Sequence, residues 1–371
     1  MLCVVVLRNE RGLEIGNEKT KRSRRAPAGN RMGNHGVSLR ELAAHLGLSL
    51  TTVSRVMNHA AAQYRIAPAT QQRVLQAAAS LNYHPNAFAR GLRNKRSSTV
   101  GVMVPEISEG YAATVLSGIE DALLEEKFFY FVVSHRHRGD LLDEYPRLLL
   151  ARAVEGIIAV DTPLHGSLPV PVVAVSGHRR IKGVLTIELD HLTAARDALT
   201  HLYELGHRRI AFIKGQTFSS DTKARWHAIL KVCESLRIPV HPELVVQLKG
   251  MAPGSEPGYV ATRELLKRSQ PFSAIFSFND ASAIGAIAAL HEAGLIVPQH
   301  VSVVGFDDIA GAATIRPALT TVRQPLYEMG RTAAMNLLRL IREGDGDQPH
   351  PSILVCPTFV TRQSTARAAS V

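Results

Sequence analysis

The sequence contains few cysteines and no long apolar run. Its three cysteines, Cys3, Cys233 and Cys356, lie far apart and form no C-x-x-C motif. This spacing argues against a disulfide framework and favours reduced thiols in a cytosolic protein. No segment approaches the roughly 20 apolar residues that span a bilayer. The apolar stretch 2–7 is too short for a signal-peptide core. We therefore expect a cytoplasmic protein without a membrane or export segment.

The sequence also lacks common catalytic and cofactor-binding motifs. It has no G-x-G-x-x-G, no P-loop, no H-E-x-x-H and no G-x-S-x-G motif. Its histidines are scattered, without the spacing of a metal site. We expect no enzymatic activity, no cofactor and no metal.

The basic charge is concentrated at the N-terminal end. Residues 1–96 hold 16 Lys and Arg against 4 Asp and Glu, whereas the rest holds 27 against 28. A cationic end joined to a nearly neutral body is typical of a protein that binds phosphate through that end. A solubilising basic tail is the alternative. The cluster Lys19–Arg25 lies in residues 1–35, which show no periodicity and which we expect to be a disordered extension.

A helix-turn-helix is predicted over 36–83. Ser38 and Glu41 have the spacing of a capping box, Gly47 ends the first helix, Ser49 caps the second, and Pro68 opens a third. The second helix ends near Met57 and would be the recognition helix. We expect Leu50, Thr51 and Arg55 to contact bases, and Ser49, Thr52 and Ser54 to contact phosphates. In the alternative interpretation Ser49 is only a cap and Arg55 a solvated side chain.

From residue 99 onward, apolar runs alternate with amphipathic helical segments, which predicts parallel sheets covered by helices. The expected strands are 100–104, 129–133, 156–160, 172–175, 209–213, 244–247, 274–278 and 301–306. Because they are too many for one open sheet, we divide the α/β core at 98–361 into two lobes. Lobe 1 comprises about 98–190 and 325–355, and lobe 2 about 191–322. The small polar residues 362–371 suggest a flexible tail.

The segments 52–58, 83–86 and 89–92 resemble the headpiece and hinge of the lactose-repressor (LacI/GalR) family of bacterial transcription regulators. The resemblance extends over nearly all of 37–360. It implies a two-lobed, periplasmic-binding-protein-like core and a homodimer, or a tetramer, on a pseudo-palindromic DNA operator. It also implies a hinge helix and linker over 84–97, in which the side chain of Leu92 wedges into the minor groove. The matching positions add Asn58, Tyr83 and Asn86 as phosphate contacts and Ala89 and Arg93 as hinge contacts. The alternative for Leu92 is helix packing.

The same resemblance implies a small-molecule effector, of a carbohydrate type, bound between the lobes at the carboxyl ends of the strands. The matching positions hold Arg225, Asn279, Asp307 and Gln324, and Phe218 offers an apolar face, as does the only tryptophan, Trp226. Alternatives are a surface Arg at 225, a helix cap at 279 and core packing for the aromatic rings. We therefore expect a repressor whose DNA binding is controlled by the effector. A solute-binding protein is the rival interpretation, disfavoured by the helix-turn-helix.

This chain departs from the family pattern at several points. The stretch 59–67 is longer than the usual loop, and Ala67 replaces the usual Ser at the third helix cap, which weakens that cap by about 1 kcal/mol. Ser176 stands where many relatives have an acidic ligand contact, and Ala228 and Ile229 replace a Gly-aromatic pair. The effector and the operator sequence are therefore specific to this chain.

Overall fold

The computed structural model describes residues 37–58, 61–83, 96–108, 110–176, 181–344 and 352–368. The chain divides into two compact units, a headpiece that ends at Ser97 and a core that begins at Ser98. The predictions for the extension 1–35 and for Asn86, Ala89, Leu92 and Arg93 lie outside the described residues.

The headpiece is built from three helices, α1 (Leu39–Leu46), α2 (Leu50–Met57) and α3 (Pro68–Ser80). The predicted capping box is present: Glu41 N donates to Ser38 Oγ at 3.2 Å, and Ser38 N donates to Glu41 Oε2 at 2.7 Å. Gly47 ends α1 in the left-handed conformation, with φ of 64°. Ala67 makes no side-chain cap at α3. The fully buried Leu42, Val53 and Val74 form the centre of this small core.

The core contains two six-stranded sheets, which confirms the predicted α/β class. In lobe 1 the strand order is β11-β5-β4-β3-β1-β2, and every pair is parallel. In lobe 2 the order is β12-β10-β9-β8-β6-β7, and only β12 is antiparallel to its neighbour. The lobe 1 strands are β1 (Thr99–Val104), β2 (Phe129–Ser134), β3 (Gly156–Val160), β4 (Val172–Val175), β5 (Val184–Leu189) and β11 (Ile353–Val355). The lobe 2 strands are β6 (Ile210–Lys214), β7 (Val245–Gln247), β8 (Ala274–Ser277), β9 (Ser302–Asp307), β10 (Thr320–Arg323) and β12 (Thr358–Val360).

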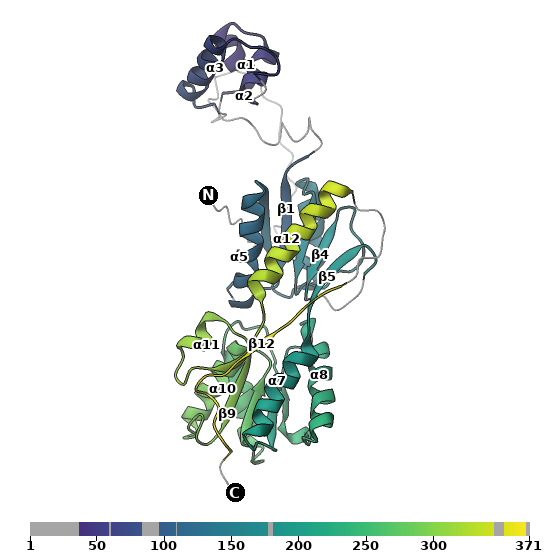
Figure 1. The fold of residues 1–371 in the computed structure, drawn as a ribbon, viewed down its shortest axis with the longest axis vertical. Helices are drawn as coiled ribbons and strands as arrows, with labels where there is room; N and C mark the ends of the chain where they lie inside the picture. The colour runs from purple at the N-terminus through teal and green to yellow at the C-terminus, as the bar shows by residue number, and fades with distance from the viewer. Residues whose placement is uncertain are drawn as a thin grey trace, which may run out of the picture. The chain divides into compact units, whose positions relative to one another are not determined.

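Helices pack against both sheets, and Figure 1 shows α5 and α12 together over lobe 1. The helices of lobe 1 are α5 (Gly110–Glu125), α6 (Gly139–Ala151) and α12 (Leu326–Glu343). Those of lobe 2 are α7 (His191–Glu204), α8 (Asp221–Leu236), α9 (Glu256–Lys267), α10 (Asp280–Glu292) and α11 (Ala310–Thr314), with a short 3-10 turn at Pro242–Leu244. Apolar clusters fill the sheet–helix layers of both lobes. None of these described helices combines the length and the apolar character that crossing a membrane requires.

Helices α5 and α12 approach each other at backbone distance. A Cβ added at Gly118 would lie 1.9 Å from the carbonyl oxygen of Tyr327, and one added at Gly330 would lie 2.0 Å from that of Val115. Both glycines are therefore required for this crossing, because any side chain would force the two helices apart. Three connections link the lobes: β5 to α7, β10 to α12, and β11 to β12.

The sequence did not predict β5, β10, β11, β12 or α6. Strands β11 and β12 have three residues each and pair only at a sheet edge. Helix α6 contains Pro146 in its interior, a residue that normally argues against a helix.

The prediction of a flexible tail over 362–371 is wrong for residues 362–368, which pack against lobe 2. Ser364 is fully buried and donates from Oγ to Val303 O at 2.6 Å while accepting from Thr320 N at 2.8 Å. Ala366 O accepts from Ser302 Oγ at 3.2 Å, and Ala368 N donates to Leu205 O at 2.8 Å. The small polar side chains that suggested a tail are the ones that fit against this surface.

We predict that Ser364→Ala lowers the free energy of unfolding of the core by about 1–3 kcal/mol, because it leaves the buried Thr320 N–H without its acceptor. Urea unfolding of the full chain measures this loss. Thr361→Ala, at an exposed position of the same segment, is the control and should change little. Equal stability of the Ser364→Ala variant and the wild type would show that the buried Ser364 hydroxyl does not stabilise the fold.

Candidate functional site

The N-terminal turn of α2 presents an open surface in the headpiece. Leu50 is 46% exposed, Thr51 is also exposed, and Thr52 and Ser54 are half-buried beside them. The opposite face of the helix is buried through Val53 and Val56. An amphipathic helix of this kind can enter a major groove with its polar face while its apolar face holds it to the headpiece.

Arg55 is not a freely solvated side chain. Its guanidinium lies over the ring of Tyr64 at 3.7 Å from the ring centroid. Tyr64 belongs to the turn at 61–65, within the stretch that is longer than the family pattern. A cation held against an aromatic face loses rotamer freedom before any ligand arrives. The chain-specific loop therefore orients Arg55, a contact that the sequence did not predict.

The other residues predicted to contact DNA have structural partners in the headpiece. Ser49 Oγ caps α2 by accepting from Thr52 N at 3.1 Å. Asn58 Nδ2 donates to Ser54 O at 2.8 Å at the other end of that helix. Tyr83 packs against the headpiece core. The capping role that the sequence left open for Ser49 is thus present, and its contact with phosphate is still a prediction.

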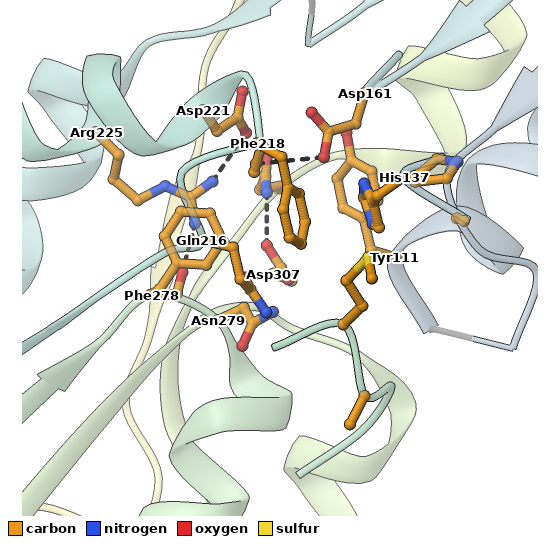
Figure 2. A pocket seen from close by; sticks show the side chains of 16 residues that line it. Tyr111, His137, Asp161, Gln216, Phe218, Asp221, Arg225, Phe278, Asn279 and Asp307 are labelled. Carbon is orange, nitrogen blue, oxygen red and sulfur yellow. Dashed lines mark hydrogen bonds and ion pairs between the residues drawn. The ribbon is translucent and has the colours of Figure 1, made fainter. Parts of the chain in front are cut away.

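In the core, polar residues gather in a pocket between the lobes at the carboxyl ends of the strands (Figure 2). In parallel sheets this edge is where ligands bind, because strand ends and helix N-termini meet there. Lobe 1 contributes Pro105, Tyr111, Ala112, His137 and Asp161. The remaining lining residues are Gln216, Phe218, Ser219, Asp221, Arg225, Met251, Ala252, Phe278, Asn279, Asp307 and Gln324.

Arg225 is the only Lys or Arg among these lining residues, and it is only 3% exposed. It lies in the second turn of α8, where NH2 donates to Asp221 Oδ2 at 3.0 Å and NH1 donates to the carbonyl oxygen of Phe278. Its guanidinium also contacts the rings of Phe306 and Phe278, at 3.6 and 4.4 Å. The alternative interpretation of Arg225 as an ordinary surface residue is therefore wrong.

Asp307 ends β9 and turns into the pocket with a φ of 112°. Few non-glycine residues adopt this conformation, and such strain is common where a fold places a functional side chain. Gln324 Nε2 donates to Asp307 Oδ1 at 2.6 Å. Burial raises the pKa of Asp307 well above its usual value, although the nearby Arg225 opposes this shift. The next residue, Asp308, instead pairs with Arg323 and Arg362, at 2.6 Å each, and braces the loop.

Two buried polar atoms in this pocket lack a protein partner among the described residues: Arg225 Nε and Gln324 Oε1. Both side chains are 3% exposed. Because buried polar groups are nearly always satisfied, such atoms are available to a ligand. Asn279 also lines the pocket, and its Oδ1 accepts from Ser282 N at 2.9 Å as the cap of α10. Asn279 therefore caps α10, the alternative that the sequence left open, and also lines the pocket, whereas its contact with an effector is still a prediction.

Asp161 joins the two lobes. It follows β3 in lobe 1 and accepts hydrogen bonds from Ser220 N at 3.0 Å, Ser220 Oγ at 2.7 Å and Ser219 Oγ at 3.3 Å, all in lobe 2. Burial and the neighbouring carboxylate of Asp221 raise the pKa of Asp161 to about 7. Ser220 Oγ also contacts the carbonyl oxygen of Ser176, at the end of β4. The loop before α8 therefore contacts the residues that follow two lobe 1 strands, β3 and β4.

Aromatic side chains line the pocket from both lobes. The rings of His137 and Phe218 stack with centroids 3.9 Å apart, and Tyr111 OH lies 2.8 Å from Ser176 Oγ. Figure 2 shows Phe218 and Tyr111 on the side of Asp161, and Phe278 beside Arg225. Trp226 does not line the pocket but packs edge-on against Phe212, so it is part of the lobe 2 core.

The structure thus brings together the five predicted effector-site residues, Arg225, Asn279, Asp307, Gln324 and Phe218. Four further lining residues were not predicted from the sequence: Asp161, Asp221, Tyr111 and His137. Asp161 directly follows a predicted strand, just as Asp307 ends one, so the strand-end rule was sufficient to find it. Asp221 and Tyr111 lie in helices α8 and α5, and no sequence motif marks either helix as part of a ligand site. In the described part of the chain no group of acidic, His and Cys side chains has the arrangement of a metal site.

Comparisons with known proteins follow the same division of the chain. Residues 38–86 match the model of bacterial regulatory proteins of the lacI family, and residues 199–365 match that of the periplasmic binding protein-like domain. Catabolite control protein A of Priestia megaterium is 31% identical, over 89% of this chain and 99% of its own length. The HTH-type transcriptional repressor PurR of Haemophilus influenzae is 29% identical, over 88% and 98%.

Solved structures agree with these sequence matches. The lac repressor dimer bound to operator and the anti-inducer ONPF has a TM-score of 0.77, with 24% identity over 90% of this chain and all of that one. A complex of the transcriptional regulator CelR with cellobiose has a TM-score of 0.64, with 28% identity over 88% and 99%. With its helix-turn-helix, its two-lobed core and full-length relatives above 30% identity, this chain belongs to the LacI family of bacterial transcription regulators.

Proposed function

We propose that this regulator is a repressor that binds a pseudo-palindromic operator as a homodimer and is controlled by a small, polar, carbohydrate-like effector in the interlobe pocket. The observation that carries the effector assignment is the pair of unpartnered buried atoms, Arg225 Nε and Gln324 Oε1, beside the strained Asp307. A pocket with a few convergent polar groups and perturbed carboxylates is the usual form of a ligand site.

The DNA-binding proposal assigns base reading to Leu50, Thr51 and Arg55. An arginine can pair with the O6 and N7 of a guanine through two hydrogen bonds, whereas leucine offers only apolar contact, for example to a thymine methyl. The cation–aromatic contact with Tyr64 supports the assignment of Arg55, because it orients the guanidinium in the free protein. Ser49, Thr52, Ser54, Asn58 and Tyr83 are proposed to position the headpiece on phosphates.

The effector proposal rests on the position of the pocket between the lobes. Asp161 of lobe 1 and the Ser219–Ser220 loop of lobe 2 are in direct contact, so a ligand that changes these contacts changes the angle between the lobes. The sugar of the CelR complex supports a carbohydrate-like ligand. In this proposal the lobe angle controls DNA binding through the segment that joins the core to the headpiece, and the effector shifts the balance between two states.

We predict that Arg55→Ala weakens binding to a specific operator by about 5-fold to 150-fold, the value of one bidentate guanine contact, but weakens binding to random DNA far less. Fluorescence anisotropy with the full chain measures both affinities, with an operator selected from a random duplex library. Arg40→Ala removes the same charge from an exposed position on α1 and should affect the two DNAs alike. Equal losses for Arg55→Ala on both DNAs would exclude base reading by this residue.

We predict that Asp307→Asn abolishes or strongly weakens the effector response while leaving the core as stable as, or more stable than, the wild type. The amide can still accept from Gln324, and it removes a buried carboxylate whose pKa is raised by burial. A thermal-shift screen with sugars, sugar derivatives and nucleobases identifies a binding compound. Titration of operator-bound protein with that compound then compares the variants.

Asp143→Asn, a carboxylate with 59% of its side chain exposed, is the matched control and should respond to the compound like the wild type. An unchanged response of Asp307→Asn would place the effector elsewhere. A loss of stability in that variant would contradict the expectation that the buried Asp307 carboxylate destabilises the core.

A further inference from the structure

We propose that the effector of this protein carries a protonated amine, as an amino sugar does, and not a carboxylate. This inference deepens the proposed function and rests on the interlobe pocket as the effector site. It names the charge of the ligand, which the family match does not specify.

Carboxyl groups outnumber cationic side chains among the residues that line the pocket. Three carboxylates line it, those of Asp161, Asp221 and Asp307, against the single guanidinium of Arg225. That guanidinium already forms an ion pair with Asp221 at 3.0 Å, where both side chains are nearly buried. Among the described residues, Asp161 and Asp307 therefore have no cationic partner in direct contact. A buried charge without such a partner is costly, so a ligand that supplies the cation is favoured.

A further carboxylate adds to this imbalance from beneath the pocket. Asp280 is fully buried at the start of α10 and accepts hydrogen bonds from Thr321 Oγ1 at 2.5 Å and Ile309 N at 2.9 Å. Its charge contributes to raising the pKa of Asp307. By contrast, Asp308 is neutralised by Arg323 and Arg362. Two arginines near the end of β9 thus pair with Asp308, whereas the neighbouring Asp307 is directed into the pocket.

The unpartnered atoms agree with a ligand that has many donors. Gln324 Oε1 is a buried acceptor without a protein donor among the described residues. Together with Asp161 and Asp307 it offers acceptors, whereas among the described lining residues Arg225 Nε is the one buried donor without a protein partner. An ammonium group has three donors and no acceptor, and hydroxyl groups supply the acceptor that Arg225 needs. A polyol with an amine satisfies both kinds of atom at once.

The aromatic walls fit the same ligand. The rings of Phe218 and His137 contact each other directly at the pocket wall, and Phe278 and Tyr111 also line the pocket. Aromatic faces attract cations and also pack against the apolar face of a sugar ring. They therefore provide a site for the ring without adding positive charge.

Matched ligands test the charge directly on the full-length protein. In the gluco, galacto and manno series, the neutral hexose, the 2-amino and 6-amino hexose, the N-acetylamino hexose and the uronic acid are compared by isothermal titration calorimetry near neutral pH. We expect an amino sugar to bind at least about tenfold more tightly than its neutral and N-acetylated counterparts, the value of one charge-assisted hydrogen bond. The uronic acids should bind weakest of all.

Charge-removing variants test which carboxylates are responsible. In Asp161→Asn and Asp307→Asn the advantage of the amino sugar over the neutral hexose should fall by about tenfold or more, while binding of the neutral hexose changes less. Asp143→Asn removes an exposed charge and should keep the full advantage. Thermal unfolding of each variant without ligand verifies that the core is folded.

The outcomes separate this inference from the proposed function. Binding of a neutral hexose, a uronic acid or a nucleobase at least as tightly as the amino sugar overturns the charge inference and leaves a ligand-controlled regulator. An amino-sugar advantage that survives in both pocket variants also overturns it, because the cation then lies elsewhere. If neither the sugars nor the nucleobases bind, the carbohydrate-like effector of the proposed function is wrong as well.

Discussion

The hydrogen bonds between Asp161 and the Ser219–Ser220 loop are the contact on which the arrangement of the core depends. They join the end of a lobe 1 strand to the start of a lobe 2 helix, directly beside the polar pocket. Because the acceptor is a buried carboxylate with a raised pKa, this contact is strong but electrostatically costly. The interface is therefore sensitive to anything that alters the charge in the pocket.

Arg225 and Asp307 show how the fold maintains that charge. Arg225 is held in the pocket by Asp221, by the Phe278 carbonyl and by two aromatic rings, and its direct ion pair is with Asp221. Asp307 is held at an unfavourable backbone angle by the strand before it and by the Asp308 ion pairs after it. The free energy for this arrangement comes from the apolar layers of lobe 2, because folding stability is shared across the whole domain.

Much of this organisation could be predicted from sequence, because it is recorded in local patterns. The capping box at Ser38, the alternation of strands and helices, and the polar residues at strand ends all depend on residues near in sequence. The residues that were missed depend on distant contacts. The roles of Tyr64, Asp221 and Ser364 become visible only from their contacts with Arg55, Arg225 and Thr320, respectively. The short strands β11 and β12 form because each can pair with the edge of a sheet. Helix α6 was not predicted because it contains Pro146, which is unfavourable inside a helix unless tertiary packing compensates.

The glycine contact between α5 and α12 has a mechanical consequence. Two helices that touch through their backbones at Gly118 and Gly330 have no flexible side chains between them to absorb a displacement. Helix α12 begins three residues after β10, at one of the three connections between the lobes. A displacement of α12 would therefore be transmitted to α5 instead of being absorbed by side chains between the two helices.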